Sequence, residues 1–201
     1  MIYNAIMVFC NRNITILYFV ACLFILTNCA QVITGTAAKV ATVSQEERSI
    51  GEFVDDAIIK TKIKNSYFDQ SDKIFFNVDV EVSQSRVLLT GTVEKIDLKI
   101  EATRIAWGVE GVKTVINEIQ ISNSDNILNF ADDLVISTKV MGKLVLDKNV
   151  NSLNYNIETV NKIVYIIGIA KSDNERDKVL DLAREVFGVE QVIDYITIST
   201  S

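Results

Sequence analysis

The sequence predicts an α+β protein made of two tandem copies of one small unit. Each copy is expected to run in the order α-β-β-α-β and to form a three-stranded mixed sheet packed on two helices. Three observations predict this. The sequence repeats at an ungapped shift of 77 residues, each copy begins with apolar residues at helical spacing, and apolar and polar residues alternate in its middle.

The repeat is clearest at the two ends of each copy. The stretch FVDDAIIKTKI at 53–63 matches FADDLVISTKV at 130–140, and VEGVKTVINEIQIS at 109–122 matches VFGVEQVIDYITIS at 186–199. Roughly 19 of about 70 aligned positions are identical, which indicates two copies of one fold. The predicted first copy, linker and second copy cover residues 52–122, 123–129 and 130–201.

Each copy should open with an amphipathic helix and continue with a strand pair. Ile59, Ile63 and Tyr67 follow one another at the four-residue spacing of a helix face. Residues 75–93 then alternate apolar and polar side chains, with a break at 83–85 where the chain is expected to turn. The sequence therefore predicts a helix followed by two neighbouring strands.

A second helix and a closing strand complete the copy. The stretch KIEATRIAWGV at 99–109 has amphipathic helical spacing, and VKTVINEIQI at 112–121 is typical of a last strand. Gly91 and its counterpart Gly168 fall late in the second strand, where a missing side chain permits a bulge or a close approach. The paired acids, Asp55-Asp56 and its counterpart, are placed in the first helical turn, where negative charge suits the helix dipole.

The N-terminal segment is predicted to be a lipoprotein signal peptide over residues 1–28. Residues 14–26 form an uncharged apolar stretch of 13, too short for the roughly 20 residues of a membrane span but suited to a signal peptide, with Arg12 before it. The following Leu-Thr-Asn-Cys resembles a bacterial lipobox, although Asn28 replaces the usual small residue. Cys29 is then the expected lipid anchor, and residues 29–51 the tether. The alternative is a plain signal peptide or an uncleaved anchor with an incidental cysteine.

Composition argues against several classes of function. The net charge is −6, and Arg12 is the only charged residue before Cys29, so the remainder carries −7. This charge argues against bulk attraction to nucleic acid or anionic lipid, and any such binding must come from a local patch. Histidine is absent and no cysteine follows Cys29, which excludes a conventional catalytic triad and a thiolate metal site there. We therefore predict no catalytic residues, no metal and no cofactor.

The element order, the leading Asp-Asp pair, the glycine of the second strand and the V-x-G-V step before the last strand resemble the BON domain. Two such copies behind a lipobox resemble the dual-BON-domain lipoproteins of bacterial envelopes. This resemblance implies an outer-membrane lipoprotein that faces the periplasm, binds phospholipid and supports envelope integrity. It also implies a link to outer-membrane assembly or cell-division proteins, and no catalysis. Ala30 fits this location, because Asp at that place in similar lipoproteins favours the inner membrane.

The first helix of the second copy is the expected membrane-binding site. With Ile136 and Val140 on its core face, a step of about 100° per residue places four apolar residues on the opposite side. Two lysines lie beside the core edge and can reach toward lipid headgroups, including anionic ones. The predicted site residues are Phe130, Leu134, Lys139, Met141, Lys143 and Val145.

Two partners remain open for this helix. The matching positions of the first copy form a smaller and interrupted apolar set, so only the second copy is expected to show apolar residues on two sides of the helix. One partner is lipid, as for an interfacial helix. The alternative is that these residues pack on the first copy or dock a protein, which would make the chain a periplasmic protein-interaction adaptor.

Overall fold

A computed structural model of the chain describes residues 50–122 and 127–199. Within the chain, residues 47–201 form one compact unit that holds both repeats. The predicted signal peptide and Cys29 lie outside the described residues, so the lipid anchor stays a prediction.

Both repeats have the predicted element order. The first contains α3 (Ile50–Gln70), α4 (Asp72–Asn77), β1 (Val78–Ser83), β2 (Arg86–Val93), α5 (Ile96–Trp107), β3 (Thr114–Asn117) and β4 (Gln120–Ile121). The second contains α6 (Ile127–Leu146), the short 3-10 helix η2 (Ser152–Asn154), β5 (Tyr155–Val160), β6 (Ile163–Ala170), α7 (Asp173–Arg184) and β7 (Gln191–Ile198).

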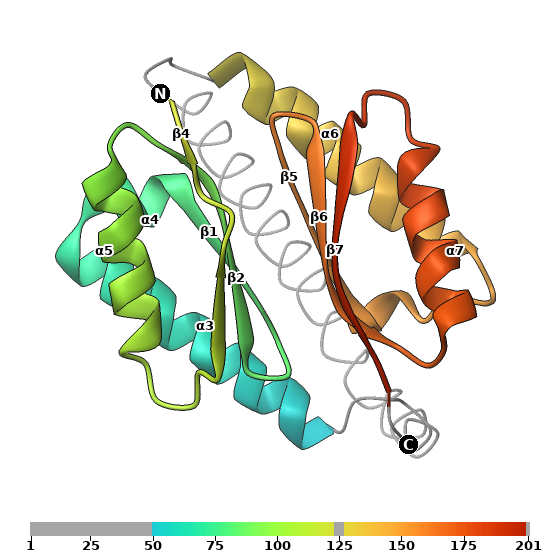
Figure 1. The fold of residues 1–201 in the computed structure, drawn as a ribbon, viewed down its shortest axis with the longest axis horizontal. Helices are drawn as coiled ribbons and strands as arrows, with labels where there is room; N and C mark the ends of the chain where they lie inside the picture. The colour runs from blue at the N-terminus through green and yellow to red at the C-terminus, as the bar shows by residue number, and fades with distance from the viewer. Residues whose placement is uncertain (1–49, 123–126, 200–201) are drawn as a thin grey trace, which may run out of the picture. The chain divides into compact units, whose positions relative to one another are not determined.

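Each repeat forms a mixed sheet, which confirms the predicted α+β class. Strand β1 runs antiparallel to β2, and β3 and β4 run parallel to β2. In the second repeat β5 runs antiparallel to β6, and β7 runs parallel to β6. The long helices cover one face of each sheet, so that each repeat is a two-layer unit (Figure 1).

The structure departs from the sequence prediction at the start of the first strand. The alternating pattern predicts a strand from residue 75, but residues 72–77 form the helix α4 and the strand begins at Val78. The Oγ atom of Ser71 accepts a hydrogen bond from the N–H of Ile74 and so caps this helix. A local cap therefore outweighs the alternating pattern there.

Each repeat has its own apolar core between its helices and its sheet. Ile59, Ile63 and Tyr67 of α3 are buried in the first core. Their counterparts Ile136, Val140 and Leu144 of α6 are buried in the second core. Burial of these side chains fixes which side of α3 and α6 faces the sheet and which side remains outward.

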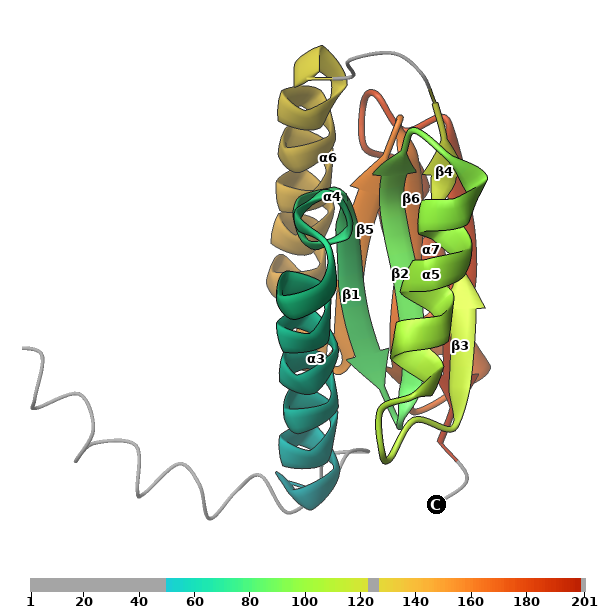
Figure 2. The ribbon, with the colours of Figure 1, turned by 90° about the vertical axis from the view of Figure 1, so that its left-hand side faces the viewer.

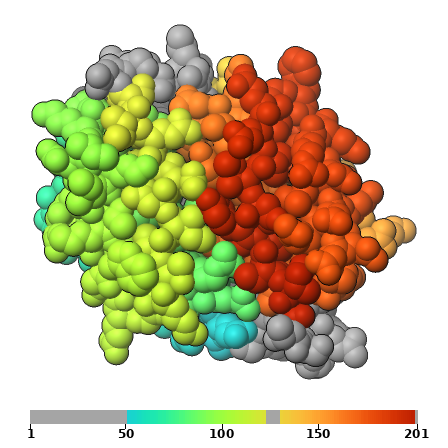
Figure 3. Space-filling model, in the orientation of Figure 1, coloured from blue at the N-terminus to red at the C-terminus, as the bar shows by residue number. Residues whose placement is uncertain are grey.

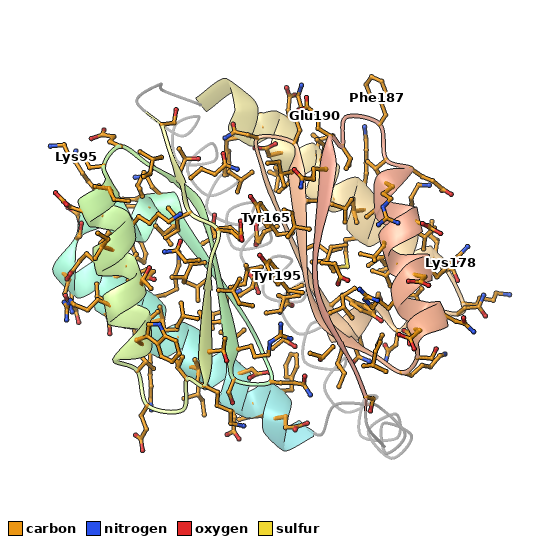
Figure 4. All side chains as sticks on the ribbon, viewed as in Figure 1. Lys95, Tyr165, Lys178, Phe187, Glu190 and Tyr195 are labelled. Atoms are coloured by element: carbon orange, nitrogen blue, oxygen red, sulfur yellow. The ribbon has the colours of Figure 1, made fainter. Side chains whose placement is uncertain are left out.

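A third apolar cluster joins the repeats through the other faces of their sheets. Leu88 of β2 packs in it with Val160, Tyr165 and Ile167 of the second repeat. Figure 1 shows the two sheets facing each other with the helices outside, and Figure 4 shows Tyr165 and Tyr195 between them. In the space-filling view the two repeats meet along a central seam (Figure 3). The repeats therefore share buried surface.

Contacts across this seam join equivalent positions. Tyr195 donates a hydrogen bond to Glu118, and these residues are 77 positions apart, which is the repeat shift. The Nδ2 of Asn161 donates to Gln120 at 2.7 Å. The symmetry-equivalent contact is also present. Thr197 is the counterpart of Gln120, and Gln84 is the counterpart of Asn161. The Oγ1 of Thr197 donates a hydrogen bond to Gln84 at 2.7 Å. The two repeats are thus related by an approximate twofold axis, as in a self-complementary dimer interface.

The aspartate pairs have a different role from the one predicted. Helices α3 and α6 begin several residues before them, so they are outside the first turn. Asp133 is buried, and its two carboxylate oxygens accept hydrogen bonds from the N–H groups of Asn161 and Lys162 at 2.7 and 2.8 Å. Both residues have positive φ angles in the β5–β6 turn. Asp133 therefore holds a hairpin turn that lacks the usual glycine, and Asp56 does the same for its own hairpin.

Candidate membrane-contact surface

The outward side of α6 carries large apolar side chains that are not buried by the fold. Phe130, Leu134 and Val145 are 68%, 58% and 62% exposed. Steps of about 100° per residue place them roughly 120° to 180° around the helix from Ile136. The helix thus has one apolar side in the core and another that is open.

The remaining predicted site residues differ in their surroundings. Met141 is partly buried and packs against the second core, so it contributes little to the open surface. Lys143 forms an ion pair with Glu185, with 2.6 Å between Nζ and Oε2. Lys139 is exposed and forms no ion pair within residues 50–122 and 127–199. Of the two lysines, Lys139 is therefore the better placed to meet an anionic headgroup.

The apolar exposure extends further around α6 than the predicted site residues. Val135 is half-exposed and Leu146 is 82% exposed, and both lie on the flank of the helix away from Phe130. The same angular count places them about 80° to 100° from Ile136, on the side that carries Lys139. They could have been found by examining both flanks of the predicted helix rather than one.

The first repeat also exposes apolar side chains on its first helix. The exposed residues of α3 are Phe53, Val54, Ile58 and Phe68. The prediction that only the second repeat has a helix apolar on two sides is therefore wrong. Val54 and Ile58 are not equivalent to any residue of the predicted α6 set, so the prediction did not include them.

Helices α3 and α6 lie along the same side of the unit (Figure 2). This follows from the approximate twofold relation, because the axis passes between the two helices and relates one to the other. Among the described residues, no helix is both long enough and apolar enough to cross a membrane.

A cavity of about 500 Å³ opens beside the N-terminal half of α6. Its apolar lining includes Phe76 of α4 together with Phe130 and Leu134 of α6. Its polar lining includes Ser137 of α6 and Glu158 of β5, with Asp79 of β1 from the first repeat. Two of the exposed apolar residues of α6 therefore border a hollow between the repeats, rather than packing tightly on the first repeat.

Among the acids that line this cavity, Glu158 has the most strongly shifted pKa. Burial raises its pKa to about 8. The negative charges of Asp79 and Glu81 and a side-chain hydrogen bond with Glu81 act in the same direction, while Lys60 opposes them. Glu81 is the equivalent residue in the first repeat, and its carboxylate lies 2.7 Å from the Nζ of Lys60. The two equivalent acids thus have different surroundings.

The described residues contain no cluster of three or more His, Cys, Asp or Glu side chains that could hold a metal ion. What the geometry defines is a pair of α-β-β-α-β units that expose their first helices.

Comparison with known families identifies this arrangement. The family model of the BON domain matches residues 55–123 and again residues 132–200. These matches cover more than half of the chain, so the protein belongs to the BON-domain family and carries two copies of the domain.

Three relatives align with most of this chain. The uncharacterized protein in the gshII 5′ region of Anaplasma centrale is 40% identical over 74% of this chain and 97% of its own length. The outer membrane lipoprotein DolP of Haemophilus influenzae is 30% identical over 84% of this chain and 87% of its own length. The osmotically-inducible protein Y of Escherichia coli is 28% identical over 75% of this chain and 76% of its own length.

Proposed function

We propose that this protein is a non-catalytic lipoprotein of the bacterial outer membrane that faces the periplasm, binds phospholipid through its second BON domain and supports envelope integrity. The observation that carries the proposal is the open apolar side of α6, formed by Phe130, Leu134 and Val145. Such a helix can lie in the membrane interface with its apolar side chains at the acyl boundary. Lys139 on the neighbouring flank adds attraction to anionic lipid.

The proposed location rests on two further observations. Cys29 follows an apolar segment of signal-peptide length, so a lipid on Cys29 would hold the protein at the membrane. The relative DolP is named as an outer membrane lipoprotein, and it aligns with most of this chain. A lipid anchor together with the α6 surface gives two membrane contacts, which is what stable anchoring requires.

Vesicle flotation of residues 47–201 tests the lipid-binding role. Leu134→Asp removes one of the exposed apolar side chains and adds a charge at the bilayer surface. Burying a leucine side chain contributes on the order of 1.5 to 3 kcal/mol, so vesicle binding should weaken by about tenfold or more. The thermal midpoint should stay nearly unchanged, because Leu134 is mostly exposed.

Ala57→Asp is the matched control, because Ala57 of α3 is the exposed counterpart of Leu134 in the first repeat. It adds the same charge but removes no large apolar side chain, so flotation should persist. If Leu134→Asp folds and floats like the unmodified unit, α6 is not the lipid site. Loss of envelope function in that variant would then assign the same surface to a protein partner, such as an outer-membrane assembly or division protein.

A further inference from the structure

Among the described residues, the ion pair between the first helix and the first strand of the first repeat has no counterpart in the second repeat. In the first repeat, Lys60 of α3 and Glu81 of β1 form an ion pair with 2.7 Å between Nζ and Oε1. A shift of 77 residues places Ser137 where Lys60 stands and Glu158 where Glu81 stands. The hydroxyl of Ser137 instead donates a hydrogen bond to Thr159 at 2.7 Å. Within the described part of the chain, Glu158 therefore has no ion pair like the one that neutralises Glu81.

The cavity lies where the second lysine would be. Ser137 and Glu158 both line it, and its volume of about 500 Å³ falls in the range of small-molecule sites. Phe76, which is 77% exposed, lies at its border with Phe130 and Leu134. Where the first repeat has a lysine, the second repeat thus has Ser137 and open space. This space lies beside the mostly buried Glu158 and next to the apolar side chains.

The lining of the cavity is acidic. It contains four carboxylates and one lysine, namely Asp79, Glu94, Asp133, Glu158 and Lys73. Lys73 is paired with Glu94 at 2.9 Å, and Asp133 is occupied by the N–H groups of the hairpin turn. Asp79 lies 3.9 Å from the Nζ of Lys64, and the side chain of Glu158 is hydrogen-bonded to Glu81. Among the described residues Glu158 has no ion pair, so its carboxyl group is the one left to meet an entering cation. The faces of the aromatic rings of Phe76 and Phe130 also favour a cation.

We propose that this cavity binds the primary ammonium group of a phospholipid headgroup, which takes the place beside Glu158 that the Nζ of Lys60 takes beside Glu81. This inference rests on the proposed membrane contact of α6 and names the lipid class. The acyl chains would leave the cavity past Phe130 and Leu134, the residues that meet the bilayer in the proposed function. An ammonium group fits better than a quaternary amine, because it has N–H donors for the carboxylate.

Binding of the ammonium group is coupled to one proton. Without a ligand, the raised pKa of Glu158 keeps its carboxyl group largely protonated near neutral pH. The groups that act on it are Asp79 and Glu81 from β1 and Lys60 from α3, and Glu81 is also hydrogen-bonded to its side chain. Ser137 and Thr159 beside it are uncharged. An ammonium ion favours the carboxylate, so the carboxyl proton passes to solvent when the headgroup binds. Affinity for the headgroup should therefore rise as the pH rises from about 7 to about 8.

The test is flotation of residues 47–201 with three kinds of vesicle. These are phosphatidylcholine alone, phosphatidylcholine with phosphatidylethanolamine, and phosphatidylcholine with phosphatidylglycerol. A charge-assisted hydrogen bond to the ammonium group should make binding to the phosphatidylethanolamine vesicles about tenfold tighter than to phosphatidylcholine alone. Equal binding to these two would overturn the inference.

Two variants decide whether Glu158 is responsible. Ser137→Lys installs the lysine of the first repeat and should remove the preference, because its ammonium group occupies the cavity. Glu158→Gln keeps the shape of the side chain and should also remove it, and it decides the matter if Ser137→Lys does not fold. Gly142→Lys is the control, because it adds a lysine to α6 at an exposed position with no neighbouring atom within 4 Å of an added Cβ.

The outcomes separate this inference from the proposed function. A preference for phosphatidylethanolamine that survives in both Ser137→Lys and Glu158→Gln reflects lipid packing and overturns the inference. Vesicle binding without any preference leaves the α6 contact in place and removes only the ammonium site. Failure to bind all three kinds of vesicle overturns the proposed function itself.

Discussion

Adding one methyl group at Gly168 of β6 should disturb the fold. A Cβ atom at Gly168 would lie 2.3 Å from the backbone oxygen of Asn154 and 2.8 Å from the Cδ1 of Tyr155. Non-bonded heavy atoms are at their best separation near about 3.5 Å, so β5 and β6 would have to separate by about 1 Å. The oxygen belongs to the backbone and cannot rotate away as a flexible side chain could.

The expected cost of Gly168→Ala is about 3 kcal/mol, at the upper end of the range for one added carbon in a packed site. For a domain of this size, about 1 kcal/mol shifts the thermal midpoint by roughly 2 to 4 °C, so the midpoint should fall by roughly 6 to 12 °C. Thermal unfolding of residues 47–201, followed by circular dichroism, measures the shift. Gly91→Ala should cost at least as much, because Gly91 approaches Asn77 in the same way and has a φ of +109°.

Gly142→Ala is the control for this prediction. Gly142 lies within α6, and a Cβ there has no neighbour within 4 Å. Alanine favours the helix over glycine by about 0.5 to 1 kcal/mol, so this variant should melt slightly higher than the unmodified protein. A midpoint for Gly168→Ala within about 2 °C of the unmodified protein would refute the close approach of β5 and β6.

Three further predictions concern the anchor, the buried acid and the seam. Cys29→Ser in the full chain should abolish labelling by radioactive palmitate. Mass spectrometry of the protein without this substitution should find a lipid on Cys29. An intact segment 14–29 in that spectrum would contradict the anchor. Because the pKa of Glu158 is raised by folding, stability should fall as the pH rises from about 4.5 to about 8, and Glu158→Gln should flatten this trend in urea unfolding at several pH values. An equally steep trend in the variant would assign the pH dependence to other groups. Residues 127–201 alone should unfold at lower urea than residues 47–201, because separation exposes Tyr165 and Ile167 of the shared cluster; equal midpoints would mean that the seam adds no stability.

Much of the fold could be predicted from the sequence because it depends on local patterns. The four-residue spacing of Ile59, Ile63 and Tyr67 determines which side of α3 is buried, and the same spacing recurs at Ile136 and Val140. The ungapped repeat then requires that both copies have the same element order. Local chemistry also explains why the predicted start of the first strand is wrong. The cap at Ser71 begins a helix within a stretch whose alternating pattern predicts a strand.

The role of the aspartate pairs could not be read from local pattern. Asp133 lies 28 residues from Asn161 in the sequence, and the contact forms only because α6 packs against the β5–β6 turn. No repeating pattern in the sequence links a side chain on a helix to a backbone N–H group in a distant turn. The tertiary structure alone shows that this acid supports a strained hairpin.

The face-to-face packing of the two sheets likewise follows from tertiary structure. The alternating pattern of the sequence predicts two faces for each sheet. It does not indicate what covers the face opposite to the helices. That face is covered by the other repeat, which brings Glu118 to Tyr195 and leaves a cavity between Phe76 and Leu134. These contacts depend on how two preformed surfaces dock, and docking is set by the shape and charge of whole faces rather than by the spacing of residues along one element.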